Sequence, residues 1–93
     1  MKRFSILTDD MEHCYICGRS PVHIHEIYFG SYKRKRSIQF GCTVPLCVDH
    51  HVGKHGVHYD HDLDWELKQK CQKRFEEIYG FINFTEVFGR NYL

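Results

Sequence analysis

The stretch that decides the fold runs from Cys14 to His58 and reads CYICGRSPVHIHEIYFGSYKRKRSIQFGCTVPLCVDHHVGKHGVH. It opens with a Cys-x2-Cys pair, and near its end a Cys-x2-His pair is followed by further histidines. Thiolates and imidazoles are the ligands that zinc prefers in proteins. The two spacings therefore predict one structural zinc site, with a second, open metal site beside it.

The structural site is predicted from two pairs of ligands that lie far apart in the chain. Cys14 and Cys17 can face one ion from a tight turn, because Gly18 accepts the positive φ that such a turn needs. Cys47 and His50 supply the second pair and complete a tetrahedral Cys3His set for Zn²⁺. A redox pair or two buried thiols are the alternatives, but no thioredoxin-like βαβ pattern surrounds the motif. The odd number of cysteines, five, also argues against a disulfide framework.

Length and charge indicate one small domain over residues 1–93. A chain of this size removes only about 60–65% of its unfolded surface from water on folding, so its core is marginal and a metal adds useful stability. The net charge is only +1, so any attraction to nucleic acid must be local. No apolar run is long enough to span a membrane, and the first ten residues lack the pattern of a signal peptide. We therefore expect a cytoplasmic protein with no membrane partner.

The middle of the stretch predicts a strand, a basic loop and a second strand. Residues 21–29 are rich in β-branched and aromatic side chains and stop at Gly30, which predicts a strand with His23 and His25 on one face. Residues 30–37 predict a loop, and residues 38–47 a strand that returns beside the first. Four consecutive cations in the loop are usually just solvated, but beside a metal site they can hold phosphates. These cations are Lys33, Arg34, Lys35 and Arg36.

Three helices are predicted after the second strand. A short one over residues 46–52 carries His50 and His51, whose side chains point about 100° apart and so serve two different ions. A long amphipathic helix over residues 60–80 begins at Asp60 or Asp62 and ends at Gly80. A short C-terminal helix begins near Asn83 or Thr85 and ends at Gly89. The long helix has an apolar stripe of Leu63, Leu67, Cys71, Phe75 and Ile78, with Cys71 as a plain core residue, and an opposite face of Lys68, Lys70, Gln72, Lys73 and Glu76.

Together these motifs resemble the HNH nucleases of the ββα-metal (His-Me finger) superfamily, most of all the small phage and prophage HNH proteins. The resemblance covers roughly residues 12–62, and residues 88–93 also resemble the end of such phage proteins. It implies an α+β fold: a zinc-knuckle-braced ββα-metal hairpin-helix core over residues 12–62, and a helical extension over residues 63–93. The motifs that carry it are Cys14-x2-Cys17, His25-Glu26-Ile27, Pro45-Leu46-Cys47-x2-His50-His51 and Gly56-Val57-His58.

The resemblance also implies a set of catalytic residues. Of His25 and Glu26, one ligates a divalent ion and the other activates water. His51 matches the family's helix histidine, and His58 its final histidine, with His55 as a rival. The implied ion is Mg²⁺ or another divalent ion such as Mn²⁺, Ni²⁺ or Zn²⁺, held by His25, His51 and His58.

This sequence departs from the family pattern in two places. Glu26 stands second in the pair, where a histidine is common, so either His25 or Glu26 can be the base; an imidazole has the better unperturbed pKa for that role near neutrality. The family's middle Asn has no match, because Cys42 and Thr43 occupy that region.

The function expected from the sequence is metal-dependent hydrolysis of phosphodiester bonds, with DNA as the expected partner and the basic run holding flanking phosphates. The rivals are a non-catalytic, zinc-braced nucleic-acid-binding module of the same fold and, from the eight histidines and five cysteines, a metal-storage or metal-sensing protein. Oligomeric state and the choice between DNA and RNA stay open at this stage.

Overall fold

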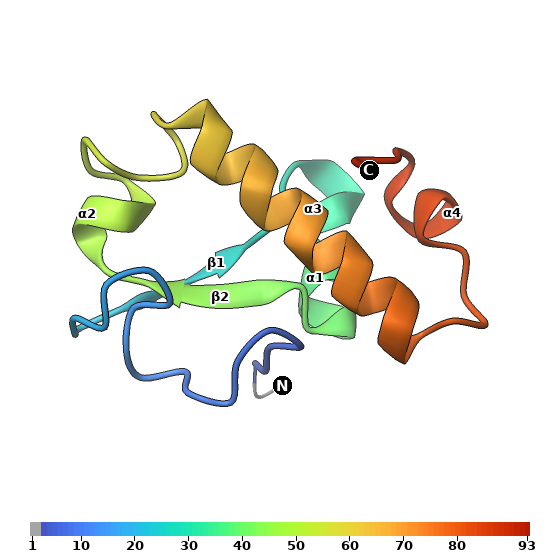
Figure 1. The fold of residues 1–93 in the computed structure, drawn as a ribbon, viewed down its shortest axis with the longest axis horizontal. Helices are drawn as coiled ribbons and strands as arrows, with labels where there is room; N and C mark the ends of the chain where they lie inside the picture. Colours follow the sequence, from blue (N-terminus) through green and yellow to red (C-terminus); the bar gives the residue numbers. More distant parts are fainter. Residues whose placement is uncertain (1–2) are drawn as a thin grey trace.

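A two-stranded antiparallel sheet lies at the centre of the computed structural model, which describes residues 3–93 (Figure 1). β1 (His23–Glu26) pairs with β2 (Thr43–Leu46), and His25 stands opposite Val44. The α+β class and the antiparallel hairpin are confirmed, although each strand is shorter than predicted. The pairing ends shortly after Glu26: the Ile27 N–H still donates to the Cys42 carbonyl at 3.0 Å, but the Tyr28 N–H donates to the hydroxyl of Ser37, 3.1 Å away.

The basic segment is a helix, so the prediction of a loop over residues 30–37 was wrong. α1 (Ser31–Phe40) also includes residues predicted to start the second strand. Lysine and arginine are good helix formers, and Gly41 ends the helix in the left-handed conformation, with φ of 74°. The helix could not be predicted from an apolar stripe, because few of its side chains are buried. Only Ser37 is fully buried there, and its hydroxyl donates to the carbonyl of Tyr28.

The other three helices lie where they were predicted. α2 (Val48–His51) follows β2 directly, and α3 (His61–Ile78) crosses above the sheet (Figure 1). Asp60 is the N-cap of α3, since its side chain accepts from the Leu63 N–H at 3.0 Å. α4 (Phe84–Phe88) is capped by Asn83 and ends at Gly89 in the left-handed conformation. None of the helices within residues 3–93 is long and apolar enough to cross a membrane.

The predicted polar face of α3 is partly covered. Gln72 is only 2% exposed, because its amide donates to the Asn91 side chain and accepts from the Tyr92 N–H. The Lys68 side chain is only 13% exposed. The C-terminal segment thus covers residues that were predicted to face solvent. The apolar stripe is largely right: Leu67, Cys71 and Phe75 are buried, Leu63 is half-buried, and Ile78 is exposed.

The core brings the C-terminal aromatic residues onto the chain that follows β1. Tyr28 is fully buried, and its ring lies 4.4 Å from that of Phe88 and 5.2 Å from that of Tyr92, centroid to centroid. The N-terminal segment has no helix or strand within residues 3–12. It is fastened by a 2.9 Å hydrogen bond from the Ile6 N–H to the Gly41 carbonyl. This packing leaves the β1–α2 end of the molecule for the metal-ligand residues.

Candidate metal centres

The first candidate centre is the predicted cysteine and histidine cage. Cys14, Cys17, Cys47 and His50 each offer one ligand atom, and these atoms all lie within 4.8 Å of one another. The sulfur atoms of Cys17 and Cys47 are 3.7 Å apart, and the Cys47 sulfur is 3.3 Å from Nδ1 of His50. Two thiolates bound about 2.3 Å from a tetrahedral Zn²⁺ are about 3.8 Å apart. The cage is therefore compatible with zinc, as predicted.

The backbone of the Cys-x2-Cys turn explains why these thiols meet. Gly18 has φ of 78°, in the left-handed region that the sequence predicted for it, and its N–H donates to the Cys14 carbonyl at 2.8 Å. The Tyr15 N–H donates to the Pro45 carbonyl at 2.8 Å. That bond ties the turn to β2, two residues before Cys47, and so brings the two ligand pairs together.

The thiols of the cage differ in acidity. Burial opposes ionisation of Cys14, but backbone N–H groups, first that of Cys47 and then that of Cys17, favour its thiolate and lower its pKa to about 6. At Cys17 the Arg19 N–H favours the thiolate, yet burial and the neighbouring thiols of Cys47 and Cys14 raise the pKa overall. Several thiolates crowded together repel one another, and a bound cation removes that repulsion.

The second candidate centre is a cluster of three histidines from three segments, which we call the histidine triad. His25 lies on β1, His51 on α2 and His58 in the turn before α3, and their ligand nitrogen atoms lie within 4.8 Å of one another. The ring centroids are 5.2 Å apart for His25 and His51, and 5.3 Å for His51 and His58. The rival residue His55 is exposed and lies 3.2 Å from the Asp49 carboxylate instead.

A tight turn brings His58 back toward α2. The Val57 N–H donates to the His50 carbonyl at 3.0 Å. A Cβ at Gly56 would lie only 2.7 Å from the carbonyl oxygen of His51, so the close approach of the two backbones requires glycine there. The triad therefore depends on the same short helix that supplies His50 to the cage.

Two histidines of the triad, His25 and His51, have lowered pKa values and unused nitrogen atoms. His25 is 3% exposed, and burial, followed by the charges of His51 and His58, lowers its pKa to about 3. Burial also lowers the pKa of His51. Nε2 of His25 and Nδ1 of His51 are buried and have no hydrogen-bond partner within residues 3–93. Unprotonated, unpartnered imidazole nitrogens fit a divalent metal ion of the transition series.

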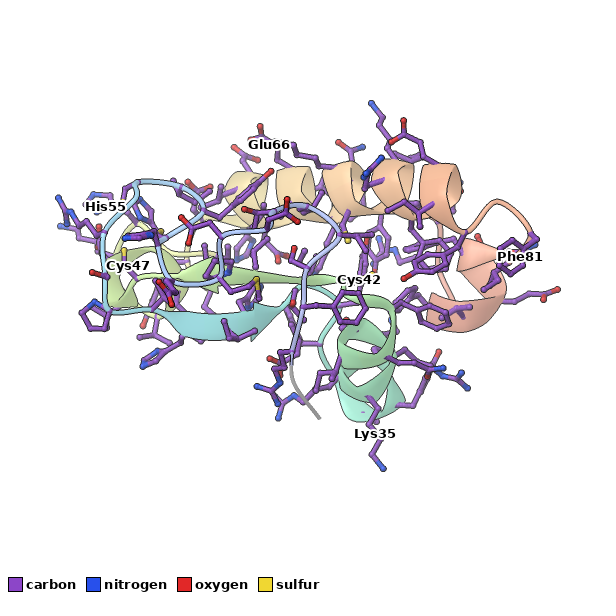
Figure 2. The ribbon with its side chains drawn as sticks, turned by 90° about the horizontal axis from the view of Figure 1, so that it is seen from below. Lys35, Cys42, Cys47, His55, Glu66 and Phe81 are labelled. Atoms are coloured by element: carbon purple, nitrogen blue, oxygen red, sulfur yellow. The ribbon has the colours of Figure 1, made fainter. Side chains whose placement is uncertain are left out.

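An open hollow of about 240 Å³ adjoins the triad. Glu26 and Arg34 line it with the histidines, and Oε1 of Glu26 is 3.4 Å from Nε of Arg34. Successive residues of a helix point about 100° apart, so the four cations of α1 cannot all face this hollow. Lys35 points away from the body of the molecule (Figure 2). Of the four cations, Arg34 therefore lines the hollow, and the phosphate-holding role of Lys33, Arg34, Lys35 and Arg36 stays a prediction.

Sequence reasoning missed several neighbours of the triad. The His23 ring lies 5.6 Å from that of His51, which the shared strand face of His23 and His25 could have indicated. Phe29 packs against His58 at 5.7 Å, and Lys68 lies over the Phe29 ring at 4.4 Å. Nothing local could have indicated Lys68, because its position on the helix predicted a solvent-facing side chain.

The two residues near the position of the missing Asn have other tasks. Cys42 is fully buried and lies at the opposite end of β2 from Cys47 (Figure 2). Its hydrogen bond with the Cys71 thiol, together with burial, raises its pKa far above the usual range. The Thr43 hydroxyl donates to the carbonyl of Phe4 at 2.7 Å. Neither side chain supplies an amide that could orient His25.

Comparisons with protein-family models, with curated proteins and with solved structures found no match to this chain.

Proposed function

We propose that this chain is a metal-dependent nuclease of the HNH type, which hydrolyses phosphodiester bonds of DNA. One observation carries the proposal: imidazoles from three segments meet at a hollow that also presents a carboxylate and a guanidinium. Three metal ligands with an open side are the usual arrangement of a hydrolytic metal site, whereas four closed ligands are the usual arrangement of a structural one. Residues 3–93 contain one cluster of each kind.

The histidine triad is the proposed holder of the divalent ion. Three imidazole nitrogens favour an ion such as Zn²⁺ or Ni²⁺ over Mg²⁺, which prefers oxygen ligands. When bound, such an ion supplies positive charge to a nonbridging phosphate oxygen and to the leaving 3′ oxygen. Burial and mutual repulsion keep His25 and His51 unprotonated near neutral pH, which is the form that binds metal.

Glu26 is the proposed base. His25 is buried, and its pKa of about 3 makes it a poor proton acceptor near neutrality. The Glu26 side chain is 13% exposed, lines the hollow and follows His25 directly in β1. Its carboxylate lies 3.4 Å from Arg34, and its other oxygen lies 4.0 Å from Arg3, so two guanidinium groups fix its direction. From there it can take a proton from an in-line water.

Arg34 is the proposed phosphate contact at the cleaved bond. Its side chain is 64% exposed, so the guanidinium can bind a phosphate at little desolvation cost. Arginine also offers paired N–H donors that match phosphate oxygens. The remaining cations of α1 add affinity for the backbone of the nucleic acid but no sequence recognition.

The test is plasmid nicking by the purified chain with Mg²⁺, Mn²⁺, Ni²⁺ or Zn²⁺. We expect nicking with at least one of the transition ions, and a loss of at least about 100-fold in His25→Ala and in Glu26→Gln, since each removes a group central to the chemistry. His55→Ala is the matched control, because its ring is exposed and contacts Asp49 instead of the triad. It should keep the wild-type rate.

Two outcomes would contradict the proposal. One is the absence of nicking with all four ions, and the other is nicking that His25→Ala leaves unchanged. DNA binding without metal-dependent cleavage would favour the alternative, a zinc-braced binding module of the same fold. A mobility-shift assay on the same preparations separates these cases.

A further inference from the structure

A row of aromatic and cationic side chains leads from the histidine triad to the C-terminal segment. Its first step is Phe29, whose ring centroid is 5.7 Å from that of His58. Lys68 Nζ lies 4.4 Å from the Phe29 centroid and 5.8 Å from that of Tyr92. Trp65 follows, with its ring 5.3 Å from Tyr92. Each step joins groups in or near contact, so the row is continuous.

The far end of this row is an arginine placed against two rings. The guanidinium carbon of Arg90 lies 5.2 Å from the Trp65 centroid and 5.3 Å from that of Tyr92. Tyr92 is buried, and two hydrogen bonds fix it to α3. Its N–H donates to the Gln72 side chain, and its carbonyl accepts from the side-chain amide of Gln69. Arg90 is exposed, and Trp65 is 38% exposed. The fold therefore holds Trp65 and Arg90 at the surface, against the buried ring of Tyr92.

The exposed end of the row carries a guanidinium and an indole that packing of the core does not require. Lys68 is paired with Asp64 at 2.8 Å, whereas the salt bridges within residues 3–93 include none for Arg90. An exposed indole beside an unpaired guanidinium is the surface that nucleic-acid-binding proteins use to stack a base and hold a phosphate. Trp65 lies in the second turn of α3 and is 38% exposed.

We propose that Trp65 and Arg90 bind an unpaired nucleotide of the substrate, at the far end of the row that begins at the histidine triad. This inference rests on the proposed function and names its substrate class: DNA with a single-stranded segment or an unpaired base to one side of the cut site. In a duplex the faces of the bases are already stacked on one another, so the indole has no free face to bind. In single-stranded DNA each base has one, and stacking is tolerant of sequence.

The test uses the fluorescence of Trp65, which is the only tryptophan of the chain. The full-length protein is titrated with a short single-stranded DNA oligonucleotide and, separately, with the same sequence as a blunt duplex. His25→Ala is used as well, so that cleavage does not change the ligand. Stacking of a base on the indole quenches its emission. We expect at least about twofold more quenching by the single strand than by the duplex at saturation, with saturation monitored by anisotropy of a labelled oligonucleotide.

Variants test the role of Trp65 and Arg90 without Trp65 fluorescence, because their binding is measured by the anisotropy of the labelled oligonucleotide. Trp65→Leu should weaken single-strand binding on the order of 10-fold, since one stacked base is lost. Phe81→Leu is the matched control: Phe81 is 86% exposed and is not part of the row. Arg90→Ala should weaken binding several-fold, and Lys73→Ala, which removes an exposed cation elsewhere on α3, should weaken it less. Circular dichroism checks that each variant is folded.

Failure of this inference differs from failure of the nuclease. Metal-dependent nicking with unchanged Trp65 emission, or with Trp65→Leu binding like wild type, overturns the role of the row alone. Quenching by single-stranded DNA without nicking under any ion overturns the nuclease and leaves the binding site. If neither oligonucleotide binds, this inference is overturned as well.

Discussion

Two neighbouring residues of α2 belong to different clusters, one to the cage and the other to the histidine triad. His50 turns to the three thiols, and His51 turns to His25 and His58. The cage has four ligands, three of them sulfur, and closes around its centre. The triad has three imidazoles and opens onto a hollow of about 240 Å³. Ligand number and softness suit the first to a permanent zinc and the second to an exchangeable ion that can still bind substrate.

The largest expected effect comes from breaking the cage. Cys17→Ser should lose the zinc and, with it, most of the folded state. Structural zinc contributes on the order of 10 kcal/mol or more, which is as much as the whole stability of a small domain, about 5–15 kcal/mol. Elemental analysis and thermal unfolding by circular dichroism measure both losses. Cys71→Ala, a core cysteine outside the cage, should lower the melting temperature yet keep one zinc per chain. Equal zinc loss in both variants would show that zinc content reports only folding.

Removing a triad histidine should affect metal exchange and leave the cage intact. For His58→Ala we expect a fold with its zinc retained, and an affinity for added Mn²⁺ or Ni²⁺ at least about 10-fold weaker, because one of three ligands is gone. Isothermal titration of the zinc-loaded protein measures this. His55→Ala should titrate like wild type. A result in which His55→Ala loses affinity and His58→Ala does not would reverse the assignment of the last ligand.

Gly56→Ala should disturb the triad through the backbone. The added methyl would lie 2.7 Å from the His51 carbonyl oxygen, so the turn that carries His58 must move. We expect a loss of about 1–3 kcal/mol in the free energy of unfolding and weaker binding of the exchangeable ion. Gly80→Ala is the matched control, since its methyl meets no atom closer than 3.4 Å. Its effect should be within about 1 kcal/mol of zero. Chemical denaturation measures the free energy of unfolding of both variants. Equal losses of this free energy would refute a steric effect at Gly56.

The smallest expected effect is at the start of α3, two residues after His58. Asp60→Ala removes the N-cap and should cost about 1 kcal/mol, because the Leu63 N–H loses its partner. Asp62→Ala, also an exposed aspartate near the helix start, makes no cap and should cost less. Urea unfolding compares them. A larger loss for Asp62→Ala would contradict the observed cap.

The sequence predicted best what depends on neighbouring residues. The spacing of the cage ligands, the positive φ at Gly18, the N-cap of α3 and the Gly89 end of α4 follow local rules and are all found. The convergence of His25, His51 and His58 came from family resemblance, because the spacing of three histidines in three segments cannot by itself show that they meet. The structure brings their ligand nitrogen atoms within 4.8 Å of one another, while their catalytic role stays a prediction.

What the sequence could not predict depends on distant contacts. The sequence predicted a loop in place of α1 because a cationic run shows no apolar stripe, and Ser37 is the one fully buried residue of this helix. Lys68 and Gln72 were assigned to solvent because the period of the helix alone places them opposite the stripe. The C-terminal segment then covers Gln72, and Tyr92 makes that contact from 20 residues away along the chain, while Lys68 lies over the Phe29 ring. Neither the helix α1 nor the burial of Lys68 and Gln72 can be predicted from neighbouring residues in the sequence.

We propose that two cations of different character lie side by side in this fold. Anomalous diffraction from crystals grown with zinc and soaked in Mn²⁺ or Ni²⁺ tests it most directly, because each metal is located by its own absorption edge. We predict a zinc peak among Cys14, Cys17, Cys47 and His50, and a peak of the soaked metal among His25, His51 and His58. A filled cage with no metal at the triad, or with the soaked metal bound elsewhere, would contradict the account.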